Sequence, residues 1–550
     1  MLAVVHNVTA ATRLLDVAEL VGGDLRVQTT FTVPPYSAFV DGTEQFLADL
    51  GIRPLPWDVA TTRHFDLAVA ASHGGDLRKL DAPRMIIPHG MGYNKYLLEP
   101  GARSPEPGAR SPEPVFGLSA EWLLDDGELI PSSLVLSHAE QLDRLVRDCA
   151  DAAGVAVLAG DPCLDRMLAS RPLRAVYRRA LGTVGDRRLV VVSSTWGEAS
   201  LFGRYPDLPA RLAANLPLDD YRVVLALHPN VWQWHTPWQI QVWTESAHRA
   251  GVRLLPAAEG WRAALVAADL VVGDHGSVTF YGAALGVPTV LAAAPTDVVA
   301  PDSAIGRFIR LAPRLDHDRP YPEQLDALLE RPAPAGLASV TALATSAPEQ
   351  AMSLVRKEFY RLLDLPEPIW PAEPLTIPVP PDIEREPGAQ LVRVELTERR
   401  AVITRYPAEL VRVAHGMPRG AHLSVDVTEP YRVFLELAEI VVVPDARDAA
   451  AVLASMPGCL LAVGMLDARS WLVIDATGLE VRCTGDAALA RVCASVVHAW
   501  LTSGRDPEEL RGALSLGLGA GTHVVTVERV QLPPDPLRVG DEPAGLGDDH

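Results

Sequence analysis

The sequence has little cysteine and no long apolar run. Five cysteines in 550 residues, with no Cys-x-x-Cys pair, argue against a disulfide framework and against a zinc site. No stretch reaches the roughly 18 uncharged apolar residues that a membrane-spanning helix needs. The N-terminal apolar stretch Met1–Val5 is too short for a secretory signal. We therefore expect a cytoplasmic protein with no metal site and no cofactor, whose membrane contact, if any, is peripheral.

Positive charge is also in deficit. The chain has 69 acidic residues against 49 Lys and Arg, which gives a net charge of −20. A surface this acidic argues against nucleic acid as the main partner and against general attraction to anionic lipid. With 48% hydrophobic and 21% charged residues, the composition is that of a globular protein, and the length predicts two or three domains.

Short apolar runs alternate with amphipathic stretches over the first 330 or so residues. Each run is rich in Val, Leu or Ile, a pattern typical of buried strands in a parallel sheet covered by helices. A basic interval, Arg171–Arg188, divides the runs into groups of about five and four. We therefore expect an α/β fold with two Rossmann-like lobes, residues 1–170 and 171–362, and a loop insertion at the direct repeat GARSPEP of residues 101–114. The nine runs are Leu2–Val5, Leu67–Ala71, Met85–Ile87, Leu134–Leu136, Val155–Leu158, Leu189–Val192, Val223–Leu227, Leu270–Val272 and Thr289–Ala293.

Proline separates the second lobe from the remainder of the chain. Eight prolines fall between residues 366 and 387, and this density predicts an extended linker over residues 363–390. Beyond it, several runs with period-2 alternation and one helical stretch, Ala487–Thr502, predict a smaller α+β domain over residues 391–535. The acidic, glycine-rich end, residues 536–550, is expected to be a disordered tail.

Candidate site residues follow the apolar runs, because ligands of parallel sheets bind beyond the carboxyl ends of the strands. His89 and Gly90 come directly after one run. Histidine can act there as a general base for a hydroxyl acceptor, and glycine lets the backbone approach a ligand. His228, before Pro229, ends another run and could hydrogen-bond a phosphate. The alternative for each histidine is that it merely caps the end of its strand.

A third strand end carries the turn Asp274-His275-Gly276-Ser277, which leads through Thr279 into an apolar helix. Ser277 is placed to cap that helix, whose first N–H groups would face a ligand and suit a diphosphate. Asp274 would repel phosphate, so we expect it to orient the turn, a ribose or a histidine. The alternative is an ordinary strand–helix turn.

Taken in order, these motifs resemble the CDP-glycerol glycerophosphotransferase family, the teichoic-acid polymerase type with a GT-B fold. The family's His-Gly pair in the acceptor lobe is matched by His89-Gly90, and its His-Pro pair by His228-Pro229. Its Asp-Tyr-Ser-Ser segment is matched by Asp274-His275-Gly276-Ser277. The remaining matches are Gly160, Pro162 and Asp165 at the end of the first lobe, and Ser194-Thr195-Trp196-Gly197 at the opening of the second.

The resemblance implies a transferase of cell-envelope type. It would move a glycerol-phosphate, polyol-phosphate or sugar unit from a CDP- or UDP-linked diphosphate donor to a hydroxyl acceptor, with inversion and without a metal. The donor would lie at the helix beginning at Ser277, near Thr195, Trp196 and the Asp274–Thr279 turn. His228 would stabilise the leaving group, and His89 would take the acceptor proton. The C-terminal domain is a candidate for homo-oligomerisation, for recruiting a partner or for covering the cleft.

Departures from the family pattern leave alternatives open. Two arginines of the family are Cys163 and Gly197 here, so two phosphate-binding cations are missing. His275, Arg204 or Arg222 could compensate. A UDP-sugar glycosyltransferase and an enzyme like the UDP-GlcNAc 2-epimerases, which share the two-lobed fold, are alternatives. So is a non-catalytic binding or scaffold protein that keeps the fold without the chemistry.

Overall fold

The chain divides into two compact units. One comprises Met1–Leu216 and Tyr221–Arg385, and the other comprises Pro217–Asp220 and Glu386–His550. The computed structural model describes residues 1–35, 40–96, 115–381, 386–413 and 417–530. The repeat at residues 101–114 and the tail expected at 536–550 lie outside the described residues.

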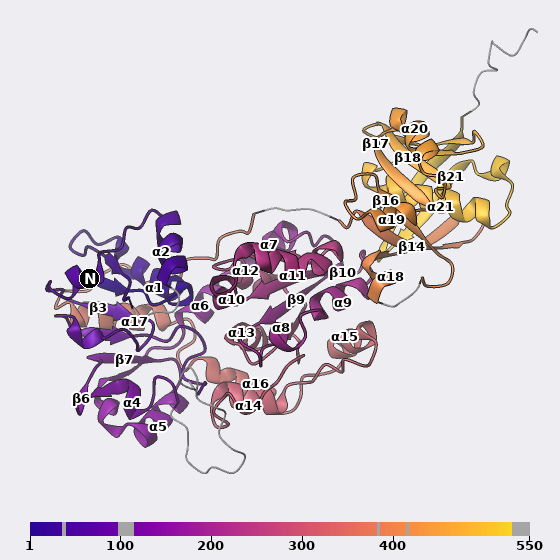
Figure 1. Cartoon of the computed structure of the whole chain (residues 1–550). Coiled ribbons are helices and arrows are strands. Elements are labelled where there is room, and N and C mark those ends of the chain that lie inside the picture. The colour runs from indigo at the N-terminus through magenta and orange to yellow at the C-terminus, as the bar shows by residue number, and fades with distance from the viewer. Residues whose placement is uncertain (36–39, 97–114, 382–385, 414–416, 531–550) are drawn as a thin grey trace, which may run out of the picture. The chain divides into compact units, whose positions relative to one another are not determined.

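The first lobe of the larger unit, which carries the labels β3 and β7 in Figure 1, is built on a parallel sheet. This sheet has six strands in the order β2-β1-β3-β4-β7-β8. Side chains alternate between its two faces: Ala3 packs toward α1 (Val8–Gly22) and α17 (Ala351–Leu362), whereas Leu2 and Val4 pack in the cluster that includes Leu145 of α5 (Ala139–Asp148). Both faces are therefore buried. The strands are β1 (Leu2–Val4), β2 (Thr30–Thr32), β3 (Ala68–Ala70), β4 (Arg84–Ile86), β7 (Ser133–Leu136) and β8 (Ala156–Leu158).

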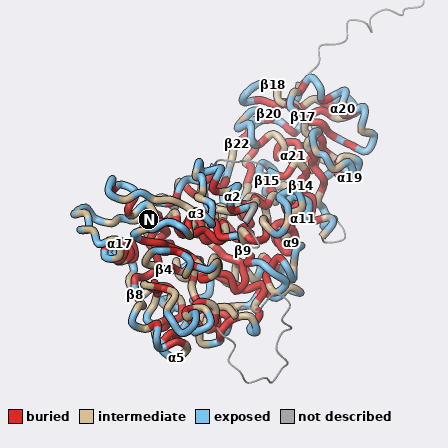
Figure 2. Tube along the Cα trace, turned by 60° about the vertical axis from the view of Figure 1, so that its left-hand side comes forward, coloured by how far each residue is buried: buried red, intermediate tan, exposed pale blue. Residues whose placement is uncertain are grey.

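The second lobe contains a five-stranded parallel sheet in the order β11-β10-β9-β12-β13. Its central strands are buried almost throughout (Figure 2), as expected for a sheet covered on both faces. The strands are β9 (Arg188–Ser194), β10 (Tyr221–Leu227), β11 (Arg253–Leu254), β12 (Leu270–Gly273) and β13 (Thr289–Leu291). Its core includes side chains of α7 (Arg174–Ala180), α12 (Trp261–Ala267), α13 (Ser277–Ala284) and α14 (Ala304–Leu311).

The predicted α/β architecture with parallel sheets is confirmed, and all nine expected runs are strands. The two sheets are consistent with the two Rossmann-like lobes that the sequence predicts. The edge strands β2 and β11 were not expected, since they have three and two residues and carry little pattern. The short hairpin of β5 (Leu124–Asp125) and β6 (Glu128–Leu129) was not expected either. One helix packs on a different lobe from the one expected. Helix α17 falls in the range expected for the second lobe, yet its Phe359 and Tyr360 pack into the core of the first.

The remaining helices of the larger unit connect or cover these sheets. None of the helices that the structure describes is long and apolar enough to cross a membrane. They are α2 (Val40–Asp49), α3 (Trp57–Ala60), α4 (Ala120–Leu123), α6 (Pro162–Ala169), α8 (Leu201–Arg204), α9 (Leu208–Ala214), α10 (Pro229–Trp234), α11 (Pro237–Arg249), α15 (Tyr321–Glu330) and α16 (Leu337–Thr341).

The proline-rich segment, residues 366–381, has no helix or strand but is fixed to the larger unit. Near its start, the Arg26 guanidinium donates to the carbonyl of Pro366 at 3.0 Å. Further on, Ile377 is buried, its N–H donates to Ser170 Oγ at 2.9 Å, and its carbonyl accepts from the Tyr177 hydroxyl at 2.5 Å. This part of the expected linker is therefore extended but anchored.

The smaller unit is a closed barrel of nine strands in the order β14-β15-β21-β22-β20-β19-β18-β17-β16, with β16 pairing back to β14. One helix, α21 (Ala490–Thr502), buries nearly its whole circumference in the barrel core. The sequence predicts the mixture of strands and one long helix, but not the closure. The strands are β14 (Ala389–Leu396), β15 (Arg400–Pro407), β16 (Ala421–Asp426), β17 (Ile440–Asp445), β18 (Leu461–Asp467), β19 (Ser470–Asp475), β20 (Glu480–Thr484), β21 (Gly512–Leu518) and β22 (Gly521–Arg529), and the shorter helices are α18 (Glu409–Val413), α19 (Arg432–Glu436) and α20 (Ala449–Ser455).

Candidate functional site

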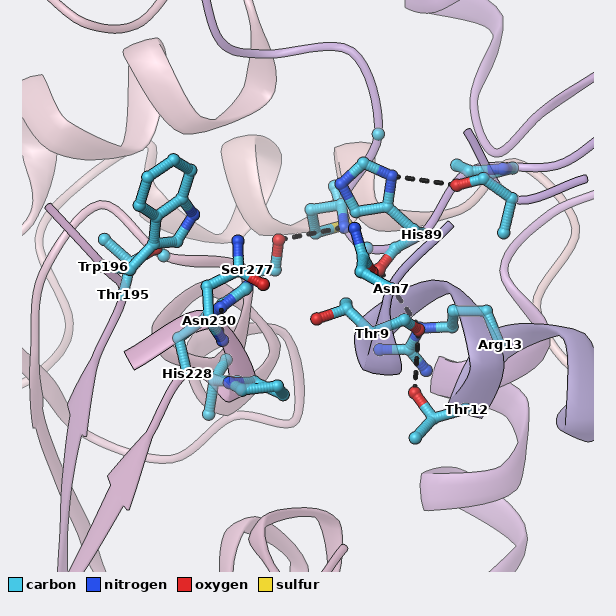
Figure 3. A pocket seen from close by; sticks show the side chains of 18 of the residues that line it. Asn7, Thr9, Thr12, Arg13, His89, Thr195, Trp196, His228, Asn230 and Ser277 are labelled. Atoms are coloured by element: carbon cyan, nitrogen blue, oxygen red, sulfur yellow. Dashed lines mark hydrogen bonds between the residues drawn. The ribbon is translucent and has the colours of Figure 1, made fainter. Parts of the chain in front are cut away.

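A cavity of about 410 Å³ lies at the carboxyl ends of the strands of both parallel sheets (Figure 3). In each sheet the strand order reverses beside the first strand, because β1 lies between β2 and β3 and β9 lies between β10 and β12. A reversal of this kind opens a crevice beyond the strand ends, where α/β proteins bind ligands. The segments that follow β1, β3 and β4 line the cavity from the first lobe, and those that follow β9, β10 and β12 line it from the second.

His89 follows β4 and presents a lone pair to the cavity. Its Nδ1 lies 3.0 Å from the carbonyl oxygen of Ala71 (Figure 3). Because a carbonyl only accepts hydrogen bonds, Nδ1 carries the proton and Nε2 the lone pair. Burial lowers the pKa of His89 to about 4; the bond to Ala71 opposes this shift, and the positive charges of Lys95 and Arg13 add to it. His89 is therefore neutral at pH 7.

His228 follows β10 and has the opposite tautomer. It stands before the first turn of α10, where its Nδ1 accepts the backbone N–H of Asn230 at 3.1 Å. The proton of the neutral ring is therefore on Nε2, which can donate. Burial, reinforced by the charge of Lys95, lowers the pKa of His228 well below its ordinary value. One cavity thus holds a histidine that can accept a proton and a histidine that can donate a hydrogen bond.

Asp274 shapes the turn between β12 and α13. Its Oδ2 accepts the backbone N–H groups of Thr195 at 2.9 Å and Leu201 at 2.8 Å, and its Oδ1 accepts that of Gly276 at 2.9 Å. Thr279 Oγ1 in turn accepts the backbone N–H of Asp274 at 3.2 Å. Asp274 and Thr279 are fully buried. They hold the turn in place from behind the cavity wall.

Ser277 is not the N-cap of α13, contrary to the sequence-based expectation. The helix begins at Ser277, and Gly276 occupies the N-cap position with no side-chain hydrogen bond. The Ser277 hydroxyl instead accepts the backbone N–H of Met91 from the first lobe at 3.2 Å. The lobes approach closely here, since a Cβ on Gly90 would lie 2.8 Å from Ser277 Oγ. Ser277 therefore joins the two lobes, and within the described part of the chain no side chain caps α13 at its N-cap position.

Most of the predicted site residues come together around the cavity. Asp274, His275 and Thr279 do not line it, because they are buried behind its wall. Gly197 has a φ of +89°, a conformation that side-chain-bearing residues rarely adopt, so the arginine of the resembled family would be strained at this position. The predicted residues that do line the cavity are His89, Gly90, Thr195, Trp196, His228, Gly276 and Ser277.

The sequence-based prediction missed Lys95 as a site residue. Lys95 lines the cavity, and its Nζ donates to Thr195 Oγ1 across the lobes at 3.2 Å. Burial lowers the pKa of Lys95, and the negative charge of Asp274 opposes that shift. The available signal was scarcity: the chain has only three lysines, Lys79, Lys95 and Lys357, and one of them follows the His89-Gly90 motif.

Arg13 is the second residue that was missed. It lies on α1, directly after the first strand of the sheet, and lines the cavity. Its Nε donates to the carbonyl of His89 at 3.4 Å, and its guanidinium carbon lies 5.5 Å from the ring centroid of Trp261.

The residues expected to replace the missing cations, namely His275, Arg204 and Arg222, do not line the cavity. In the part of the chain that the structure describes, no group of three or more His, Cys, Asp or Glu side chains is placed to hold a metal ion.

No protein-family model and no curated protein sequence matches the chain. Its structure is similar to that of the wall teichoic acid polymerase TagF, with 11% identity and a TM-score of 0.45 over 66% of this chain and 89% of that chain. It is also similar to a putative UDP-N-acetylglucosamine 2-epimerase from Listeria monocytogenes (13% identity, TM-score 0.41, 67% of this chain and 98% of that chain). A UDP-GlcNAc 2-epimerase from Neisseria meningitidis bound to UDP-GlcNAc gives 13% identity and a TM-score of 0.40 over 66% and 98%. Likeness of this degree carries no argument about activity.

Proposed function

We propose that the chain is a transferase of the GT-B type that moves a glycerol-phosphate, polyol-phosphate or sugar unit from a nucleotide-diphosphate donor to a hydroxyl acceptor. The observation that carries the proposal is the histidine pair of the cavity. His89 offers a lone pair on Nε2, whereas His228 offers a proton on Nε2. A transfer to a hydroxyl needs one group that takes the proton of the attacking hydroxyl and another that hydrogen-bonds the departing oxygen.

The reaction follows from these two roles. The acceptor hydroxyl attacks the transferred unit, forms the new bond and gives its proton to His89 Nε2. The bond between that unit and the nucleotide breaks, and its electron pair stays on the departing phosphate oxygen. His228 Nε2–H hydrogen-bonds that oxygen as negative charge accumulates on it, and the open N–H groups at the start of α13 provide further donors.

Donor binding would also activate the base. In the free protein the pKa of His89 is lowered to about 4, first by burial and further by the positive charges of Lys95 and Arg13. A diphosphate brings negative charge into the same cavity and offsets those cations, so the pKa of His89 rises toward the working pH. A base with a pKa nearer the working pH accepts the acceptor's proton more readily. The donor therefore binds first, and the proton of the acceptor hydroxyl is transferred to His89 afterwards.

Nucleotide binding and turnover test the proposal in sequence. CDP and UDP are first compared by thermal shift, since a ligand at 100 times its Kd stabilises the folded protein by about 2.7 kcal/mol. Turnover of CDP- and UDP-linked donors is then compared for wild type, His89→Asn and His228→Ala. The amide that His89→Asn introduces can still donate to the carbonyl of Ala71 but cannot take a proton, so kcat should fall by about 10²–10⁴ while nucleotide affinity persists.

The exposed His64 supplies the matched control, and His64→Ala should leave turnover unchanged. If no nucleotide binds, the alternative of a non-catalytic scaffold is favoured. If a donor turns over and neither cavity variant slows it, the assigned roles of the two histidines are wrong. A preference for CDP or UDP decides between the two donor classes.

A further inference from the structure

Lys95 carries a positive charge that no neighbouring carboxylate neutralises. Among the described residues no Asp or Glu oxygen lies within ion-pair distance of its Nζ, whose hydrogen-bond acceptor is the uncharged hydroxyl of Thr195. Asp274 attracts it from farther away. A cation withdrawn from bulk water is normally paired or bound to a ligand, because its desolvation is costly.

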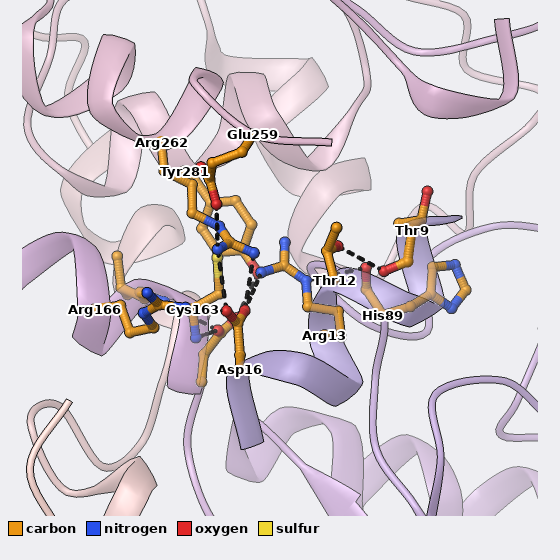
Figure 4. A network of polar contacts seen from close by, with 12 residues as sticks. Thr9, Thr12, Arg13, Asp16, His89, Cys163, Arg166, Glu259, Arg262 and Tyr281 are labelled. Carbon is orange, nitrogen blue, oxygen red and sulfur yellow. Dashed lines mark hydrogen bonds and ion pairs between the residues drawn. The ribbon is translucent and has the colours of Figure 1, made fainter. Parts of the chain in front are cut away.

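Arg13 belongs to a buried cluster of arginines and carboxyl groups, part of which Figure 4 shows. Asp16 is shared by three guanidinium groups: it contacts Arg166, lies 2.8 Å from Arg262 and lies 3.4 Å from Arg13. A second carboxylate, Glu259, is taken by Arg262 at 2.9 Å. Arg13 makes the longest of these contacts, and it is the arginine that lines the cavity. The buried carboxyl group of Asp161 also attracts Arg13.

The loop that carries Lys95 is held in position from both lobes. Tyr93 has a φ of +61°, which is unfavourable for a large side chain, and its hydroxyl is fixed to the carbonyl of Val135 at 3.0 Å. The carbonyl of Asn94 accepts the N–H of Ala300 of the second lobe at 2.8 Å, and Lys95 forms a β-bridge with Val299. Strained backbone of this kind is typical of functional sites.

We propose that Lys95 and Arg13 bind the diphosphate group of the nucleotide, so that the neutralising cations come from the first lobe. The inference rests on the proposed function, which brings a nucleotide diphosphate into this cavity. Two cations on different segments of the cavity wall can each contact one phosphate group of a diphosphate, whereas a monophosphate offers a single phosphate group. The second lobe adds His228 Nε2–H and the start of α13. The diphosphate is then held from both lobes, and Lys95 and Arg13 take the place of the two arginines that the resembled family has at Cys163 and Gly197.

Calorimetric titration of the full-length protein with UDP, CDP, UMP and CMP tests this assignment. Lys95→Met should weaken binding of the preferred diphosphate at least tenfold, which corresponds to about 1.4 kcal/mol. It should also narrow the preference for diphosphate over monophosphate. Lys95→Arg should restore most of the affinity. Lys79→Met is the matched control, because Lys79 is an exposed lysine of the same lobe and is paired with Asp76. The Lys79→Met variant should bind the diphosphate with the affinity of wild type.

A second readout separates binding from a structural role. Lys95→Met removes an unneutralised charge, so the Tm of the nucleotide-free protein should stay the same or rise, while the Tm shift produced by nucleotide shrinks. Arg13→Gln should weaken diphosphate binding in the same way, with the exposed Arg63→Gln as its control. A residue that merely supports the fold would lower the Tm of the free protein instead.

The outcomes separate this inference from the proposed function. If wild type binds none of the four nucleotides, the proposed function itself fails. If wild type binds a diphosphate and Lys95→Met binds it equally well, the function stands and the role of Lys95 is wrong. If only Arg13→Gln is without effect, the role of Arg13 is wrong. Equal wild-type affinity for diphosphate and monophosphate overturns the assignment of both residues.

Discussion

At the scale of single residues, the backbone around each histidine determines what that histidine can do. Ala71 offers His89 a carbonyl, which fixes a proton on Nδ1, whereas Asn230 offers His228 an N–H, which fixes the lone pair there. Two identical side chains therefore present opposite groups to one cavity. The difference comes from position: His89 follows its strand into a loop, whereas His228 stands at the start of a helix.

The histidines of the larger unit also predict how its stability depends on pH. Burial lowers the pKa of His73 and of His275 to about 3 and that of His89 to about 4, from 6.5. The unfolded chain therefore binds more protons than the folded chain between about pH 6.5 and these values. The free energy of unfolding should fall as pH decreases from about 6.5 toward 4. A series of Tm measurements between pH 7.5 and 4 checks this expectation.

His73 provides the variant for that series. Neither of its ring nitrogens has a hydrogen-bond partner among the residues that the structure describes, and its ring packs edge-on against Phe116 and Tyr93. His73→Phe keeps an aromatic ring and removes one titrating group, so the decline in Tm toward acidic pH should become shallower. A wild-type Tm that is constant from pH 7 to 4.5 would contradict the assigned shifts.

Local pattern identified the histidines but not the two cations. His89 and His228 each end an apolar run, a signal contained in a few neighbouring residues. Lys95 and Arg13 are candidates because they face the same cavity and because Lys95 donates to an uncharged hydroxyl across the lobes. That condition depends on segments about a hundred or more residues away, such as Thr195 for Lys95 and Arg262 for the cluster around Arg13.

At the scale of elements, the β12–α13 turn depends on one carboxylate. Asp274 accepts three backbone N–H groups from two loops, so Asp274→Asn removes one charged acceptor oxygen and places an amide N–H₂ against N–H donors. Each buried donor left without a partner costs about 1–3 kcal/mol. We expect a loss of roughly 3 kcal/mol, measured as a lower urea midpoint with an unchanged slope.

The exposed Asp297 lies in the same lobe and serves as the control for this variant. Asp297→Asn should change the free energy of unfolding by no more than about 0.5 kcal/mol, as is usual for surface substitutions. If the two variants behave alike, the hydrogen bonds of Asp274 do not hold the turn, and the positions of Thr195 and Gly276 in the cavity wall need another explanation.

Element prediction succeeded where strands are short, continuous and buried, because such strands carry their pattern within a few residues. It failed for the closure of the barrel. Arg400–Ile403 of β15 pairs with Ser515–Leu518 of β21, more than a hundred residues later. No local period encodes that pairing, since alternation fixes which face of a strand is buried and not which strand lies beside it.

At the scale of the whole larger unit, Asp16 links the two lobes. It lies on α1 of the first lobe and pairs with Arg262 of α12 in the second. Asp16→Asn removes the carboxylate that Arg166, Arg262 and Arg13 share, and breaking a buried ion pair by removing one partner costs about 3–5 kcal/mol. Calorimetric unfolding should show a lower Tm for the larger unit, with the transition of the barrel unit unchanged.

An exposed ion pair offers the comparison for that measurement. Arg147 and Asp302 lie 2.7 Å apart, and their side chains are 56% and 41% exposed. Because exposed pairs contribute about 0–1 kcal/mol, Asp302→Asn should lower the Tm far less than Asp16→Asn. Similar decreases in Tm for both variants would show that burial does not determine how much each ion pair stabilises the fold.

The proline-rich segment described with the fold has a mechanical consequence. It is attached to the first lobe at Pro366 through Arg26, and to the second at Ile377 through Tyr177 and at Pro381 through Arg253. The eleven residues that follow Pro366 up to Ile377 can span at most about 40 Å, at roughly 3.6 Å per residue in a fully extended chain. The segment thus tethers the two lobes and sets an upper limit on the distance between its two attachment points. While both attachments hold, the lobes can part to exchange ligands only as far as this length allows.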